Sequence, residues 1–298
     1  MLSSFTSDPP PLFVFEMDEA GVVGVRRDAR TLEPEVRGER FFEPGVVDPA
    51  PGRPNIRDVQ AVEEAVRSLL AEIGPVKRNE AALILPDESS RLTVLDFETL
   101  PSKREEVDRL LRFRLTKSVP FDVQGARLAS VVQRNGQGVA ALVAVTAAEV
   151  VRQYESVLEA AGLWPGYVSV SAASALNLAP DSGMTLFAKL SSRMLTLSAV
   201  DGGAVRMVRA VERAPESLDN AERALDDMLA DLYPTLVFVA DNLGAKVDRL
   251  TLCGFGDLLH PALQRFPREL GCTVETVQSP FGPPPARECG IWGYLRLQ

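Results

Sequence analysis

The chain has 298 residues, a formal charge of −9 and a pI near 4.9, so it has room for one large domain or two ordinary ones. Its acidity disfavours nucleic-acid binding, which needs a basic face. The longest apolar run, at 139–145, is far shorter than the about 20 residues of a transmembrane helix, and the first thirty residues lack a signal-peptide pattern, so we expect neither a membrane span nor a signal peptide.

Strands and helices alternate in the prediction for the first half of the chain. Apolar residues recur at helical spacing before Gly74-Pro75, a pair typical of a helix end. Ser102 and Thr146 each open a capping box, which predicts a helix start, and Asn135-Gly136 predicts a hairpin turn. In chain order we expect strands at 12–17 and 22–25, a helix at 56–73, strands at 81–85 and 91–97, a helix from 102, strands at 127–133 and 139–145, and a helix from 146.

The second half repeats this order of elements, although no residue-level repeat is visible. A helix after 218 is expected to break or kink at Pro234, because proline cannot donate to the helical ladder. The other predicted elements are strands at 186–190, 194–200, 205–211, 249–253 and 272–277, a turn at Gly254-Phe255-Gly256, and a helix at 258–270. Alternating strands and helices indicate an α/β fold with helices on the faces of a sheet.

The chain holds few residues suited to metal or nucleophilic catalysis. Cys253, Cys272 and Cys289 form no CxxC pair, and His260 is the one histidine. A zinc site or a Ser-His-Asp triad is therefore not expected. We interpret His260 as a surface or helix-start residue and the cysteines as reduced core or surface residues.

Three groups of segments resemble type IV pilus assembly proteins of the PilM class, and their order and spacing carry the resemblance. The likeness covers most of 12–298. The matching segments are 82–86, 110–114 and 118–121, then 143–145, Tyr154 and 159–165, and finally 250–256 and 271–274.

This resemblance implies an actin-like (ribonuclease H-like) two-lobed fold with an FtsA/PilM-type insert. The first lobe would span 1–180, with an inserted β-α-β subdomain at about 77–145, and the second lobe 181–298. It also implies a cytoplasmic protein, peripheral at the inner membrane. Its partners would be other pilus assembly proteins and the short cytoplasmic N-terminal segment of a PilN-like membrane protein, held in a groove bordered by the insert.

The stretch of this chain that matches the family's first phosphate-binding loop departs from the family pattern. Actin-like ATPases need glycine turns that bring backbone N–H groups to the phosphates, and carboxylates that manage the Mg²⁺ shell. The matching stretch has Glu16 in place of the aspartate, Asp18 in place of the glycine and Val23 in place of the lysine. We expect Glu16, Asp18 and Glu19 to repel polyphosphate.

The rest of the nucleotide cleft is also degraded. The second loop falls at 188–191, without its carboxylate or glycine, and 211–218 leaves no room for the subdomain that covers the nucleotide. The residual nucleotide-cleft positions are Glu16, Gly254 and Gly256, and a lone GxG is weak evidence because many tight turns use it.

These features favour a non-catalytic scaffold of a type IV pilus or related secretion assembly, with no metal and no bound cofactor. The alternatives are an actin-fold ATPase, for which ATP and Mg²⁺ would be the cofactors, or a GspL-like cytoplasmic domain of a type II secretion system.

One predicted helix face leaves two alternatives open. Phe113 either contacts a partner or packs under the neighbouring lobe, and we expect the packing. Arg104, Arg109, Arg112 and Arg114 are interpreted as a solvated helix face, with attraction to anionic lipid or an acidic peptide as the alternative.

Overall fold

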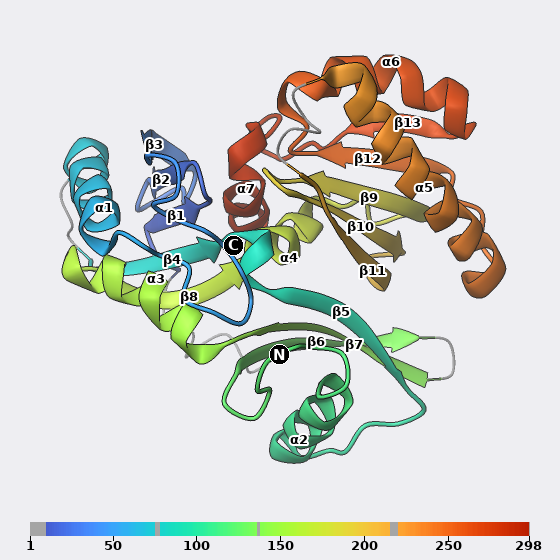
Figure 1. Ribbon diagram of the computed structural model, residues 1–298, viewed down its shortest axis with the longest axis horizontal. Helices are drawn as coiled ribbons and strands as arrows, with labels where there is room; N and C mark the ends of the chain where they lie inside the picture. Colours follow the sequence, from blue (N-terminus) through green and yellow to red (C-terminus); the bar gives the residue numbers. More distant parts are fainter. Residues whose placement is uncertain (1–9, 75–77, 136–137, 215–219, 298) are drawn as a thin grey trace.

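Two five-stranded sheets with the same topology form the two lobes of the protein (Figure 1). The computed structural model describes residues 10–74, 78–135, 138–214 and 220–297. Within these ranges no helix is both long and apolar enough to cross a membrane. The sequence predicts the same order of elements in both halves, and in the structure both five-stranded sheets have the same strand topology.

The first sheet has the order β3-β2-β1-β4-β8. β1 pairs antiparallel with β2 and parallel with β4, so the hairpin expected at 12–25 forms one half of the sheet. β4 and β8 are parallel, as strands joined by a crossover are. The strands are β1 (Phe13–Met17), β2 (Gly21–Arg27), β3 (Pro34–Phe41), β4 (Glu80–Leu85) and β8 (Trp164–Val170).

The second sheet repeats this arrangement in the order β11-β10-β9-β12-β13. β9 pairs antiparallel with β10 and parallel with β12, as β1 does with β2 and β4. Its strands are β9 (Met184–Leu190), β10 (Met194–Asp201), β11 (Ala204–Glu212), β12 (Arg249–Cys253) and β13 (Thr273–Thr276).

Helices α1 (Val59–Ile73) and α3 (Ala148–Ala160) cover the outer face of the first sheet, and α5 (Ala221–Leu243) and α6 (Leu259–Leu270) cover that of the second (Figure 1). The α1 periodicity explains this packing, because Val62, Val66, Leu69 and Ile73 are its buried residues. Asp58 caps α1 by accepting from the N–H of Ala61 at 3.0 Å.

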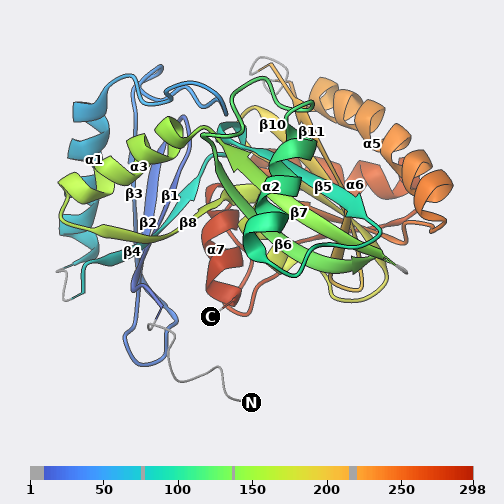
Figure 2. The ribbon, with the colours of Figure 1, turned by 90° about the horizontal axis from the view of Figure 1, so that it is seen from below.

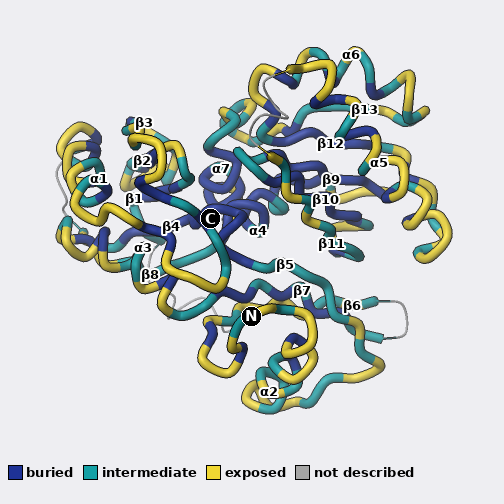
Figure 3. The backbone as a smooth tube through the Cα atoms, viewed as in Figure 1, coloured by how far each residue is buried: buried dark blue, intermediate teal, exposed yellow. Residues whose placement is uncertain are grey.

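Two further helices cross between the sheets, and each packs on the sheet of the other lobe. α4 (Ser171–Ala175) follows the first sheet, yet Ala175 packs with Phe187 and Cys253 of the second. α7 (Cys289–Arg296) follows the second sheet, and its Ile291 and Tyr294 pack against the first. Both helices are buried at the centre of the molecule (Figure 3).

The crossing of α4 and α7 depends on a glycine. A Cβ atom added at Gly293 would lie 2.0 Å from the carbonyl oxygen of Ser174. The two helix backbones therefore touch, and a larger residue at position 293 must push them apart.

A smaller antiparallel sheet, in the order β5-β7-β6, forms the insert, which lies below the two lobes in Figure 1. Helix α2 (Arg104–Leu115) covers the face of this sheet that is seen from below in Figure 2. The expected range of 77–145 included β4, which belongs to the first sheet, because β4 is paired on both sides there. The insert strands are β5 (Arg91–Phe97), β6 (Arg127–Asn135) and β7 (Gly138–Thr146), and the hairpin turn expected at Gly136 lies outside the described residues.

Both predicted capping boxes are wrong. The N-cap residues are Lys103 and Ala147, and neither makes a side-chain capping bond. Thr146 is the last residue of β7, paired with Arg127, so its side chain is held in the sheet. Ser102 lies one residue before the extended N-cap of α2.

The helix does not break at Pro234, because α5 runs through it from Ala221 to Leu243, and a kink there stays a prediction. Pro234 and Ala230 both lie on the exposed side of the helix, so the carbonyl that Pro234 cannot bond faces water. Leu218, the expected first apolar position, lies outside the described residues.

The expected packing of Phe113 is not found, since its side chain is 68% exposed. α2 buries Leu111 and Leu115 on the insert sheet and leaves Phe113 on the opposite face. Arg112 is not simply solvated, because it donates to the carbonyls of Val123 and Ala126.

We expect Gly293→Ala to lower the free energy of unfolding by about 3 kcal/mol, the upper part of the usual range for overpacking. Gly166→Ala is the matched control, because a Cβ there meets its first neighbour only at 3.8 Å. Urea unfolding of both variants measures the difference, and equal small losses would contradict the contact between the two helices.

Candidate functional site

Glu16 lies one residue before the end of β1, and its carboxylate binds the start of α7. It accepts from the Ser171 hydroxyl and from the N–H groups of Gly290 and Ile291, the latter two at 3.3 and 2.9 Å. The N-terminal N–H groups of a helix favour a carboxylate. Even so, burial raises the pKa of Glu16 to about 7, against the opposing effect of Lys189.

A buried ion pair between Lys189 and Asp87 joins the lobes. Lys189 of β9 donates to the Asp87 carboxylate at 2.6 Å, and both side chains are almost fully buried. Burial alone, the largest single effect, would lower the pKa of Lys189, but the carboxylate of Asp87 and the other acidic groups nearby together raise it. Asp87, in the 3-10 turn η1 (Asp87–Ser89), also accepts from the N–H of Ala172 in α4 at 2.6 Å.

The turn of the first hairpin satisfies its own N–H donors. The Asp18 carboxylate accepts from the N–H groups of Ala20 and Gly21, each at 2.8 Å. Arg287 then holds the same carboxylate through two bonds of 2.7 Å. Asp18 is thus neutralised, which differs from the free acidic loop that the sequence suggested.

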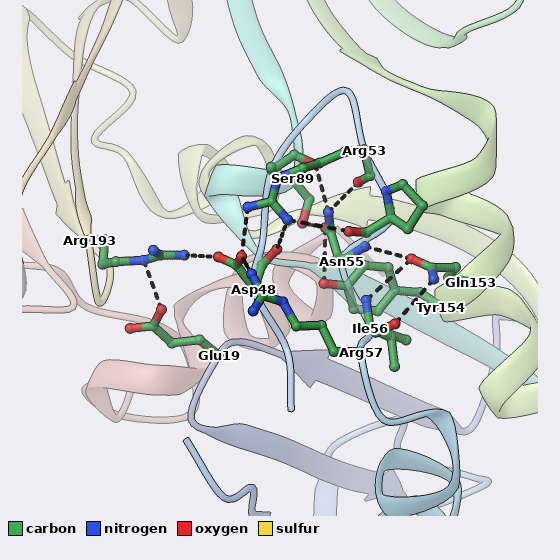
Figure 4. Close-up of polar contacts among 12 residues, drawn as sticks. Glu19, Asp48, Arg53, Asn55, Ile56, Arg57, Ser89, Gln153, Tyr154 and Arg193 are labelled. Carbon is green, nitrogen blue, oxygen red and sulfur yellow. Dashed lines mark hydrogen bonds and ion pairs between the residues drawn. The ribbon is translucent and has the colours of Figure 1, made fainter. Parts of the chain in front are cut away.

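The turn of the second hairpin reaches across to the first. The Arg193 guanidinium lies 2.8 Å from the Glu19 carboxylate and 3.3 Å from that of Asp48 (Figure 4). The N–H of Arg193 and the hydroxyl of Ser191 both donate to Glu88. These contacts close the space between the two hairpin turns with side chains of the protein.

Asp48 belongs to a loop that is fixed to the first lobe through Asn55 (Figure 4). The Asn55 side-chain oxygen accepts from the hydroxyls of Ser89 at 2.7 Å and Tyr154 at 3.2 Å. Its backbone N–H donates to Gln153 at 2.6 Å. The ion pair from Arg193 to Asp48 therefore joins the second lobe to a loop that hydrogen bonds fix to the first lobe.

Gly254 and Gly256 lie in the expected tight turn, which enters the 3-10 helix η4 (Gly256–Leu258), with φ of 78° and 51°. A Cβ atom at Gly254 would lie 2.3 Å from the Leu190 carbonyl oxygen and 3.3 Å from that of Ala286. The close approach that requires this glycine is thus made by the chain itself.

The expected cleft positions surround one segment of the chain. Glu16 contacts this segment, at 286–291, from the first lobe. On the side of the second lobe, a Cβ atom added at Gly254 or Gly256 would lie 3.3 or 3.7 Å from Ala286. The segment begins in the 3-10 turn η5 (Ala286–Glu288) and continues into α7. The residues present do not fit Mg²⁺ and ATP, because Glu16, Asp18 and the turn N–H groups already have partners within the protein.

Sequence reasoning missed the residues that fill this site. The sequence predicts Lys189 only as part of the second loop, and no predicted motif includes Arg287 or Gly290, because the partners of all three are distant in sequence. The signal available was the glycine spacing within the apolar end of the chain, where Gly290 and Gly293 alternate with large residues. Such spacing is typical of a helix that packs closely against another backbone.

A groove of about 660 Å³ lies between the insert and the first lobe. β6 borders it on one side and β8 on the other, and each is the outermost strand of its sheet among the described residues. Outermost strands expose unpaired N–H and C=O groups, which can pair with an added extended chain.

The lining of this groove is mainly apolar and includes two charged residues. Val131 and Leu142 come from the insert and Val168 from β8, whereas Arg127 and Glu155 supply charge. The second lobe adds Val205, whose backbone N–H and carbonyl both bond the Gln133 side chain of β6. All three parts of the protein therefore border the groove.

The sequence matches no family model and no curated protein. The structure is similar to a chain of the PilM–PilN type IV pilus biogenesis complex, with a TM-score of 0.75 and 17% identity over 89% of this chain and 88% of that one. It is also similar to a Bacteroides thetaiotaomicron protein with an actin-like ATPase fold and unknown function, with a TM-score of 0.52 and 10% identity over 89% and 90%.

A third similarity is to the cytoplasmic domain of EpsL, an inner-membrane component of the Vibrio cholerae type II secretion system. Its TM-score is 0.49, at 15% identity over 80% of each chain, which is too low to carry an argument. The first two similarities confirm the actin-like α/β fold and, at the level of the fold, the resemblance to PilM-class proteins.

The raised pKa of Glu16 predicts that the stability of the folded protein depends on pH, and that Glu16→Gln removes this dependence. Between pH 4.5 and about 7 the folded protein keeps a proton that the unfolded chain releases, so stability falls as pH rises through this window. The free energy of unfolding of the wild type, relative to Glu16→Gln, should fall by about 3 kcal/mol across it. Urea unfolding at several pH values measures this difference, and a constant or rising difference would contradict it.

Proposed function

We propose that the protein is a non-catalytic scaffold of a type IV pilus or related secretion assembly, which holds the N-terminal cytoplasmic segment of a PilN-like inner-membrane protein. The groove between β6 and β8 carries this proposal, because it offers two open strand edges and an apolar lining on a PilM-like fold. Binding such a segment would place the protein at the cytoplasmic face of the inner membrane.

The absence of catalysis in this proposal rests on the filled space between the lobes. Phosphoryl transfer depends on positioned backbone donors and a metal shell of carboxylates. In this protein Asp18 takes the N–H groups of its own turn, and α7 takes the carboxylate of Glu16. These contacts favour a scaffold over an actin-fold ATPase.

The open strand edges favour an extended segment over a helix. An extended chain can bond to one edge by its backbone and fill the apolar lining with alternate side chains. Arg127 and Glu155 of the lining can then fix its direction through charged residues of the segment.

Val131→Asp tests the groove. Val131 is 63% exposed and lines the groove, so the substitution should leave the fold intact while it places a charge against an apolar segment. We expect binding to weaken at least about tenfold. The probe is a labelled synthetic peptide of the cytoplasmic N-terminal segment of the single-span membrane protein encoded beside this chain, followed by fluorescence anisotropy.

Val132→Asp is the matched control for this experiment. Val132 is 51% exposed on the same strand but does not line the groove, because neighbouring side chains of a strand point to opposite faces. It should bind the peptide as the wild type does. Equal binding by both variants, or no binding by the wild type, would contradict the proposal.

A further inference from the structure

α5 carries an apolar stripe on its exposed side. Tyr233, Val237 and Phe238 are 43%, 58% and 44% exposed, whereas Leu225, Met228 and Leu232 face the second sheet. The stripe, which we define as Ala230, Tyr233, Pro234, Val237 and Phe238, follows the three- and four-residue spacing of one helix face.

A surface helix ordinarily exposes charged residues on this face. Here no charged residue occurs from Leu232 to Ala240, over more than two turns. Tyr233 is held in place because its hydroxyl donates to the backbone carbonyl of Glu269 in α6 at 3.0 Å. The stripe is therefore a fixed apolar surface, and such surfaces are typical of interaction sites.

Acidic residues surround the stripe. α5 contains five acidic residues and a single basic one, Arg223. Asp226 is paired with Arg265, and Asp231 with Arg209 and Arg213. Glu222, Asp227 and Asp241 are further negative charges along the helix, and they outnumber the nearby exposed cations Arg223 and Arg268. An anionic membrane surface would be repelled here. A second copy in an antiparallel contact would bring acidic ends together.

A groove between α5 and α6 lies on the N-terminal side of the stripe. This groove has a volume of about 450 Å³, and Glu222 and Leu225 line it from α5, with Pro261, Arg265, Arg268 and Glu269 from α6. Residues 222–238 of α5 extend over about 24 Å. A third helix of similar length could pack along this line by ridges and grooves.

We propose that an amphipathic helix of a partner protein docks on the stripe, with apolar residues at positions i, i+3 or i+4, and i+7 and with lysine or arginine residues beside them. The apolar residues cover Tyr233, Val237 and Phe238, and the basic residues meet the acidic ends of α5. This contact goes beyond the proposed function, since no stripe residue lines the groove between β6 and β8.

Site-specific photo-cross-linking in living cells of the organism whose genome encodes this protein tests the proposal. The full-length protein carries the photoreactive residue p-benzoylphenylalanine in place of Val237, or in place of Val59 as a control that is 42% exposed on α1. The expected result is an adduct specific to position 237, whose cross-linked segment has the stated apolar spacing and basic residues. An adduct with a second copy or with lipid, or no adduct beyond that of the control, would overturn the proposal.

Binding of the cross-linked segment then gives a quantitative test. A labelled synthetic peptide of that segment should bind Val237→Asp at least about tenfold more weakly than the wild type, and Val59→Asp unchanged. Binding should also weaken as salt is added, because opposite charges contribute. Thermal unfolding checks that Val237→Asp stays folded, and unchanged affinity in a folded variant would refute the docking site.

Discussion

The crossing of α4 and α7 between the two sheets is the contact on which the rest of the structure depends. Each helix leaves its own lobe and packs on the sheet of the other, so neither lobe completes its core alone. Gly293 lets the two backbones touch, and Gly290 brings α7 against the carboxylate of Glu16. Because the buried Lys189–Asp87 pair lies beside this crossing, moving one lobe would separate charges that water cannot reach.

The fixed position of the two lobes affects both the space between them and the groove between β6 and β8. In an actin-like fold the inner space is where a nucleotide could act, but here the segment at 286–291 and the bridge from Arg193 lie there. The groove between β6 and β8 receives Val205 from the second lobe, held by Gln133 of the insert. A fixed arrangement of lobes therefore also fixes the shape of the groove, which suits a scaffold that binds without a cycle of opening.

Much of the fold could be predicted from the sequence, because strands and long amphipathic helices leave local patterns. The hairpin-first order of both lobes and the buried face of α1 are of this kind. The site could be predicted only in part. Glu16, Gly254 and Gly256 do lie around one place, but their partner is α7, and Lys189 meets Asp87 across 102 residues. Such long-range pairs leave no local pattern, and local rules also failed where Thr146 belongs to a strand and where Pro234 lies on the exposed side of a continuous helix.

The most direct test of this account is the melting temperature of the full chain with and without millimolar ATP and Mg²⁺. A ligand present at 100 times its Kd adds about 2.7 kcal/mol to stability, which for a chain of this size raises the melting temperature by about 5 °C. The account predicts an unchanged melting temperature, because α7 and Arg193 already occupy the space between the lobes. A rise that saturates with ATP concentration would contradict it.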